Sequence, residues 1–178
     1  VLELANKVKE SLQNTDSEFP GKVEVWDEAE KTTGWKINEA ELKGVPVVIS
    51  IGPREVSENN LSVATRLGEK DKIQLDGVFQ SIEKLLVRIQ NDLFDRAKKF
   101  VKENTHEVSL YDEFKKIMEG PRGFIRAFWC ESAECEEKIK EETKATTRCL
   151  PLDAKNEDGK CIYCDKKATH RWIFAQAY

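Results

Sequence analysis

Gly159–Cys164 reads GKCIYC, and this short stretch decides how the last third of the chain folds. Cys161 and Cys164 stand two residues apart, and upstream Cys130 and Cys135 form a second pair with four residues between them. Two such pairs, distant in sequence, supply the four thiolates of a tetrahedral zinc site that ties two chain segments together. Because four thiolates leave no open coordination position, we predict that these cysteines bind a structural Zn²⁺.

Disulfide bonds are the alternative use of paired cysteines. They need an oxidising compartment, usually reached through a signal peptide, whereas Val1–Lys7 (VLELANK) is a charged amphipathic run. Disulfide pairing would also leave Cys149 as an odd thiol. Two residues compete as metal ligands, His170 and Cys149. The four thiolates suffice without His170, and we expect Cys149, in a strand-like run, to be a small buried hydrophobe.

Composition and charge limit the function further. The chain has 178 residues, 39% of them hydrophobic and 35% charged, which is enough for one ordinary domain and a small metal-stapled module. No apolar stretch approaches the roughly 20 residues that span a bilayer, so we expect no membrane partner. The net charge of −4 argues against a general nucleic-acid coat protein, whose affinity rests on many phosphate contacts. A local site that reads a few bases by hydrogen bonding stays possible.

The first part of the chain alternates between helical and strand patterns. It predicts an opening helix that ends near Asn14 and a long helix from Asp76 to about Asn104, whose apolar stripe runs from Val78 to Phe100. Between the two helices we expect a strand over residues 22–26, a short helix over 35–43, a central buried strand over 45–51, a turn over 52–55, and a hairpin formed by 61–67 and 72–75.

The second part begins at a break over residues 104–106, which we take as the domain boundary. It predicts strands over 124–129, 146–150 and 171–177 and helices over 109–119 and 132–143, and the first of these strands leads directly into Cys130. The order of elements predicts an α/β domain over residues 1–105, followed by a small α+β zinc-binding domain over 106–178.

Long motifs in both parts carry a family resemblance. They are Thr33–Pro46 (TGWKINEAELKGVP), Ile51–Glu55 (IGPRE), Thr65–Lys70 (TRLGEK), Glu141–Pro151 (EETKATTRCLP), Gly159–Cys164 (GKCIYC) and Phe174–Tyr178 (FAQAY). With these motifs nearly the whole chain resembles prolyl-tRNA synthetase of the archaeal and eukaryotic type, which also occurs in some bacteria. The resemblance implies a mixed-sheet class IIa anticodon-binding domain followed by the zinc-binding C-terminal domain.

The resemblance also implies a function and partners. The function is anticodon recognition in the ligase that attaches proline to its tRNA with ATP, and the partners are proline tRNA, the catalytic domain of the same polypeptide and a second copy in a cytoplasmic homodimer. In the family the catalytic domain, with its ATP and Mg²⁺, lies upstream of this region. We therefore expect this chain to contain no catalytic residue and to be inactive alone. In the family a strand precedes the opening helix; that strand is missing here.

Base recognition is assigned to a few side chains. Proline anticodons carry guanine at their second and third positions; a carboxylate accepts from its Watson–Crick edge, and an arginine donates to the two acceptors on its major-groove edge. The resemblance places these groups at Glu41, Arg54 and Glu55. Relatives often carry a further arginine at the position of Val48, where it helps in some of them to hold the anticodon. Trp35 either stacks on a base or covers the sheet as part of the core, which we favour.

Two further expectations concern the second half of the chain. Lys98, Lys99 and Lys102 are interpreted as a solvated helix face. In the family the terminal tyrosine, Tyr178 here, faces the catalytic domain, so its carboxylate is expected to be functional in the whole enzyme.

Two other function classes remain at this point. A non-catalytic, zinc-stapled protein-interaction module is favoured slightly by the negative charge and by Val48. A redox or metal-transfer role for Cys161 and Cys164 is disfavoured because four thiolates close the site.

Overall fold

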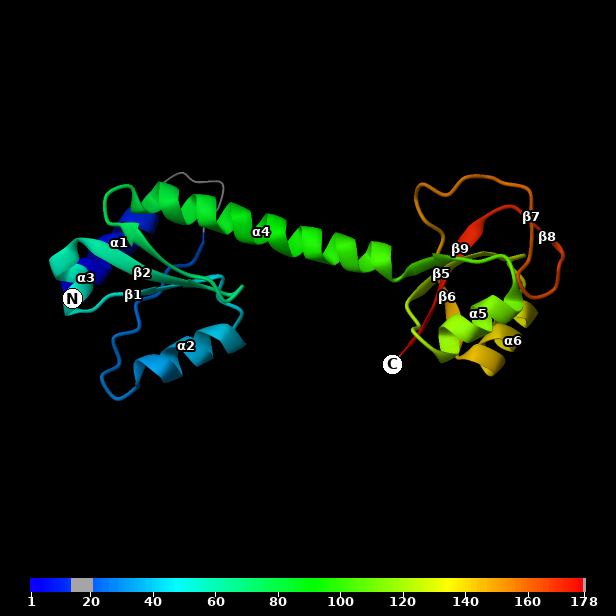
Figure 1. Ribbon diagram of the computed structural model, residues 1–178, viewed down its shortest axis with the longest axis horizontal. Helices are drawn as coiled ribbons and strands as arrows, with labels where there is room; N and C mark the ends of the chain where they lie inside the picture. The colour runs from blue at the N-terminus through cyan, green and yellow to red at the C-terminus, as the bar shows by residue number, and fades with distance from the viewer. Residues whose placement is uncertain (14–20, 178) are drawn as a thin grey trace. The chain divides into compact units, whose positions relative to one another are not determined.

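The computed structural model describes residues 1–13 and 21–177 (Figure 1). The chain divides into two compact units, Val1–Asp95 and Arg96–Tyr178, and each is described by itself. The division falls within helix α4 (Val78–Glu103). The family-domain boundary predicted between residues 105 and 106 lies after the end of this helix and stays a prediction.

The first unit contains a three-stranded antiparallel sheet in the order β1-β2-β3. Its elements are α1 (Leu2–Gln13), α2 (Thr33–Leu42), β1 (Val47–Ser50), α3 (Pro53–Glu58), β2 (Asn60–Thr65), β3 (Lys70–Gln74) and the start of α4. In the sheet, Val48 lies opposite Ala64, and Ser62 lies between Ser50 and Lys72. The predicted hairpin is confirmed, with Gly68 in its turn at a φ of +87°, a conformation that favours glycine.

The two faces of this sheet differ because side chains alternate along each strand. Leu61 and Val63 of β2 are buried and pack with Val8 of α1 and with Val78 and Ile82 of α4. Ser62, which lies between them, and Ala64, which follows Val63, therefore point to the opposite face. That second face carries both polar and apolar side chains, and Ile37 of α2 lies beside it.

Several predicted elements of the first unit are wrong. Residues 22–26 form no strand: the Trp26 indole donates to the Glu24 carboxylate, and among the described residues no strand pairs with this segment. Strand β1 is half-buried and lies at the edge of the described sheet instead of its centre. The predicted turn over 52–55 is the start of helix α3, since Pro53 occupies the first helical turn, where its missing N–H costs nothing.

The second unit contains a four-stranded mixed sheet in the order β4-β5-β9-β6. Its strands are β4 (Thr105–Glu107), β5 (Phe124–Phe128), β6 (Ala145–Cys149) and β9 (Arg171–Gln176), and its helices beyond α4 are α5 (Tyr111–Glu119) and α6 (Ala133–Thr143). Strand β4 runs parallel to β5, and the other pairs are antiparallel. A separate small hairpin is formed by β7 (Gly159–Lys160) and β8 (Lys167–Ala168).

The core of the second unit lies between its sheet and the helices α5 and α6. Its most deeply buried members include Phe114 and Met118 of α5, Ile139 of α6, Ile125 of β5 and Phe174 of β9. The mixed α/β architecture predicted from the sequence is confirmed. The parallel pairing that makes a sheet mixed occurs in this unit, whereas the described strands of the first unit pair only antiparallel.

Two surface findings complete the description of the fold. The predicted apolar stripe of α4 does not extend to its end, because Phe100 is 62% exposed. Within residues 1–13 and 21–177, no helix has both the length and the apolar run needed to cross a bilayer.

Candidate functional site

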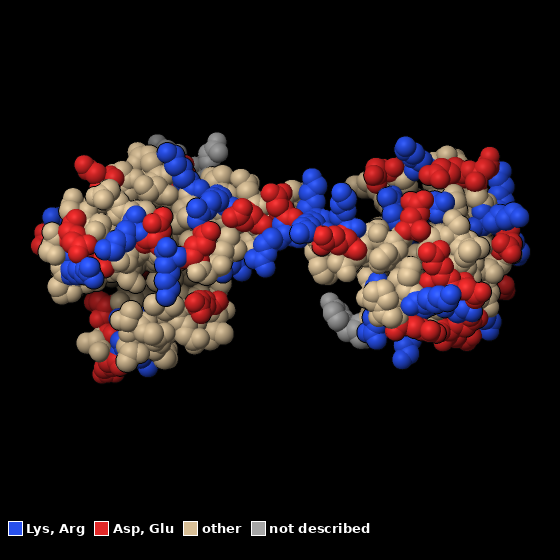
Figure 2. Space-filling model, in the orientation of Figure 1, with Lys and Arg blue, Asp and Glu red and all other residues tan. Residues whose placement is uncertain are grey.

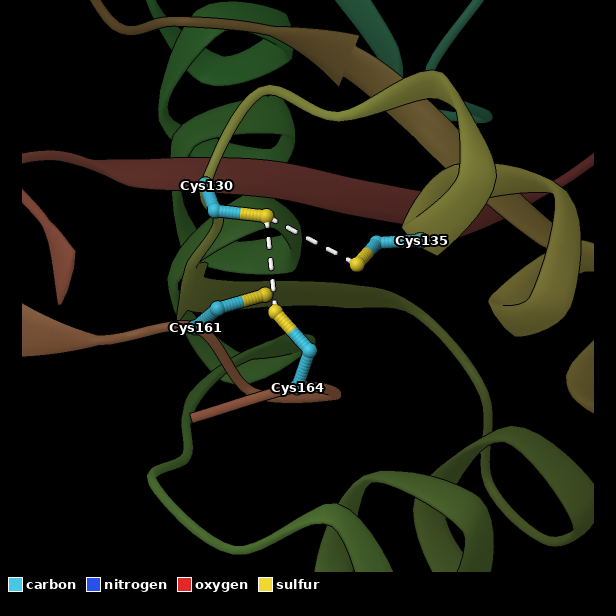
Figure 3. A group of neighbouring side chains, drawn as sticks. All are labelled: Cys130, Cys135, Cys161 and Cys164. Atoms are coloured by element: carbon cyan, nitrogen blue, oxygen red, sulfur yellow. Dashed lines mark hydrogen bonds between the residues drawn. The ribbon is translucent and has the colours of Figure 1, made fainter. Parts of the chain in front are cut away.

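The second unit brings the four predicted metal ligands together. The Sγ atoms of Cys130, Cys135, Cys161 and Cys164 all lie within 4.8 Å of one another (Figure 3). The Cys130 sulfur lies 3.6 Å from that of Cys135 and 3.6 Å from that of Cys164. A tetrahedral Zn²⁺ with Zn–S bonds of about 2.3 Å holds its sulfur atoms roughly 3.8 Å apart, so the cluster fits such an ion.

Two tight turns place these sulfur atoms. Cys130 follows β5, and a left-handed Glu131 (φ +59°) turns the chain so that Cys135 enters in the first turn of α6. Cys161 and Cys164 lie in the loop between β7 and β8. That loop is closed by the hydrogen bond from the Cys161 N–H to the Lys166 carbonyl, 2.8 Å long.

The surroundings of the cluster affect the pKa values of its thiols in different directions. Burial raises the pKa of the Cys135 thiol and that of the Cys130 thiol above the ordinary cysteine value. Burial acts in the same direction at Cys164, but hydrogen bonds from the backbone N–H of Lys166 and from the neighbouring thiols outweigh it and lower its pKa. Buried thiols form thiolates only where a positive charge compensates them, as a bound divalent metal does.

The competing ligands lie outside the cluster. The Nδ1 atom of His170 is 3.0 Å from the Thr169 hydroxyl, and neither His170 nor Cys149 belongs to the cysteine group. The expectation that Cys149 is buried is wrong: it is exposed at the end of β6, beside a register shift in the pairing with β9. Alternation along a strand does not predict burial across such an irregularity.

The second face of the sheet in the first unit borders a cavity of about 560 Å³ between α2 and the sheet. It is lined by Ile37, Ser50, Ser62, Val63, Ala64, Lys70, Asp71 and Lys72. We call this cavity the sheet groove. Lys70 and Lys72 are two residues apart on β3 and therefore share a face. Sequence reasoning missed both lysines, although their alternation with Asp71 and Ile73 is the pattern that predicts a shared face.

Two predicted recognition residues belong to α2. Glu41 is exposed and lies one helical turn beyond Ile37, on the side of α2 that adjoins the sheet groove. No hydrogen bond or ion pair to another described residue engages its carboxylate. Trp35 is 43% exposed, with the Lys31 ammonium 4.6 Å from its ring centre, so the favoured interpretation of Trp35 as core is wrong. Val48 shares the face of Ser50 and Ala64, which is that of the groove.

The other two predicted residues lie on α3, and their side chains have partners within the chain. Arg54 donates from Nε to the Glu58 carboxylate at 2.8 Å. Glu55 accepts from the Ser62 hydroxyl at 2.8 Å and from the Gly52 N–H at 2.9 Å. The hydrogen bond from Ser62, and then that from Gly52, lower the pKa of Glu55. One oxygen of Glu55 thus fastens α3 to β2 and the other caps the start of α3, while the Nη atoms of Arg54 stay available.

Three further residues singled out in the sequence lie on the long helix α4. Lys98, Lys99 and Lys102 are exposed on α4, and Lys99 faces Glu103 at 3.8 Å. Figure 2 shows basic and acidic side chains interspersed on the face drawn, in keeping with the net charge of −4. Tyr178, whose carboxylate the sequence singles out, lies outside the described residues.

Comparison with known proteins identifies relatives of both units. Residues 111–178 match the family model of the prolyl-tRNA synthetase C-terminal region, and residues 1–85 match that of an anticodon-binding domain. The chain is 48% identical to proline–tRNA ligase 2 of Clostridioides difficile strain 630 over 157 residues, 88% of this chain and 33% of that protein. It is 41% identical to the proline–tRNA ligase of Alkaliphilus oremlandii over 180 residues, 100% of this chain and 36% of that protein. The chain belongs to the prolyl-tRNA synthetase family.

Within that family it represents the C-terminal region, an anticodon-binding domain followed by the prolyl-tRNA synthetase C-terminal domain. The chain spans about a third of the length of the curated relatives that it matches. The sheet groove, Glu41 and Arg54 all fall in the anticodon-binding match, and the cysteine cluster falls in the C-terminal match.

Proposed function

We propose that this chain recognises the anticodon of proline tRNA as the C-terminal region of a proline–tRNA ligase. The observation that carries the proposal is the sheet groove, a recess lined by both apolar and polar side chains, with Lys70 and Lys72 on its β3 side and the unengaged carboxylate of Glu41 on the neighbouring helix α2. The match of residues 1–85 to an anticodon-binding domain and the names of the relatives of the chain support the same function. Sequence-specific reading of RNA loops needs such a recess, into which splayed bases enter.

The proposal gives each side chain a role. Glu41 accepts from the Watson–Crick edge of guanine, and the Nη atoms of Arg54 donate to the acceptors of the other edge. Glu55 supports α3 from within, because its carboxylate is already engaged. The exposed Trp35 offers a face on which a base can stack.

The cysteine cluster is proposed to hold a structural Zn²⁺. Cys130, Cys135, Cys161 and Cys164 would bind the ion as thiolates, and the ion would join the β5–α6 turn to the β7–β8 loop. Proline activation with ATP and Mg²⁺ belongs to the catalytic part of the whole enzyme, which we propose to be a cytoplasmic homodimer.

The test is the affinity of this chain for proline tRNA and for a version whose anticodon guanines are replaced. We expect Glu41→Ala and Arg54→Ala each to weaken binding of proline tRNA by ~1–3 kcal/mol, since each removes hydrogen bonds to a base edge. The same changes should scarcely affect the replaced version, which lacks the matching groups.

Lys99→Ala is the control, because it removes a charge outside the groove. It should weaken binding of both tRNAs alike and reduce the dependence on salt, if it has any effect. Equal affinity of Glu41→Ala, Arg54→Ala and wild type for both tRNAs would show that the bases are read elsewhere. A chain that binds neither tRNA would favour the protein-interaction module instead.

A further inference from the structure

Glu58, the last residue of α3, connects three elements beside the sheet groove. Its Oε1 accepts the Nε–H of Arg54 at 2.8 Å, within α3 itself. Its Oε2 accepts from the Lys72 ammonium of β3 at 2.9 Å and from the Asn60 side-chain amide of β2 at 2.9 Å. One carboxylate therefore fixes the orientation of two cations, of which Lys72 lines the groove.

The contact between Glu58 and Arg54 determines which N–H groups of the Arg54 guanidinium remain free. An arginine has five N–H donors in a rigid planar fork. With Nε–H bound to Glu58, the two Nη groups remain to donate, and such a pair can reach two acceptors of one guanine end-on. The Arg54 side chain is 77% exposed, so without Glu58 it would sample many rotamers and lose that freedom only on binding.

We propose that Glu58 is a positioning residue for anticodon reading, which orients Arg54 and Lys72 at the groove before RNA arrives. This inference rests on the proposed function. It predicts that removing Glu58 strengthens the affinity for RNA in general but weakens the preference for the matching anticodon. The negative charge of Glu58 repels the phosphates of every RNA, whereas its hydrogen bonds favour only an RNA that presents the matching base.

The experiment is a tRNA titration of the Glu58→Ala chain, with Glu103→Ala as the matched control. Glu103 also forms an ion pair with a residue four positions before it, Lys99, and lies outside the groove. We expect Glu58→Ala to bind the guanine-replaced tRNA at least as tightly as wild type. The preference for proline tRNA should fall about two- to fivefold, the effect expected for an exposed ion pair. Glu103→Ala should leave that preference unchanged.

A double-mutant cycle separates positioning from a general structural effect. If Glu58 acts through Arg54, the Glu58→Ala change should have little further effect on the preference in an Arg54→Ala background. An unchanged or increased preference in Glu58→Ala, together with a reduced one in Arg54→Ala, would overturn the inference and leave the proposed function intact. A wild-type chain with no preference between the tRNAs would instead overturn the proposed function.

Discussion

The positions of the cysteines distinguish the proposed metal ligands from Cys149, which is not one of them. Cys135 and Cys161 are buried within the cluster, whereas Cys149 is exposed outside it. Structural zinc contributes on the order of 10–16 kcal/mol of apparent binding free energy at neutral pH, so loss of one ligand should remove the metal and unfold the second unit. We expect this result for Cys135→Ser and Cys161→Ser, checked by elemental analysis and circular dichroism. The ligand assignment is wrong if Cys149→Ser loses the metal and Cys135→Ser keeps it.

Glu58 should titrate far below an ordinary carboxyl group. Hydrogen bonds from Arg54, then Asn60 and Lys72, lower its pKa from 4.5 to about 2. Between pH 4.5 and about pH 2, the Glu58 carboxyl group therefore stays ionised in the folded protein, whereas it takes up a proton in the unfolded protein. The contribution of Glu58 to stability is complete above about pH 4.5 and disappears as the pH falls through about 2. Carboxyl NMR should show this low midpoint, and Arg54→Ala should raise it; an unchanged midpoint would contradict the contacts.

Strand β5 depends on a glycine immediately before it. Gly123 has a φ of +96°, and a Cβ added there would meet the Asn104 carbonyl oxygen at 2.4 Å. That carbonyl accepts the Phe124 N–H at 2.8 Å, where β4 and β5 begin to pair. Gly123→Ala combines an unfavourable φ with a backbone clash, so it should destabilise the second unit by at least ~1–3 kcal/mol. Chemical denaturation measures this loss, with Gly34→Ala as control, since a Cβ at Gly34 meets nothing within 4 Å.

Some helices and strands could be predicted from sequence patterns alone, and others could not. The β2–β3 hairpin and the cysteine pairs were predictable because turn residues and ligand spacings are local signals. The strand expected at residues 22–26 failed because a strand needs a neighbour, which alternation within one segment cannot supply. Similarly, Pro53 favours a turn and a first helical turn alike, so α3 was missed. The partners of Arg54 and Glu55 were not predictable, because they depend on how α3 packs against the sheet.

The whole chain combines two units whose stabilities have different origins. The core of the first unit, which includes Val8, Leu61 and Ile82, contains no metal ligand, whereas Cys135 and Cys161 belong to the core of the second. A chelator should therefore unfold the second unit and spare the first. Hydrogen exchange measured by mass spectrometry would show protection lost in β5 and β9 but kept in β2. Since the sheet groove lies wholly in the first unit, preference for the proline anticodon should survive chelation. Simultaneous loss of protection in both units would mean that they unfold cooperatively, and the anticodon preference would then depend on the metal.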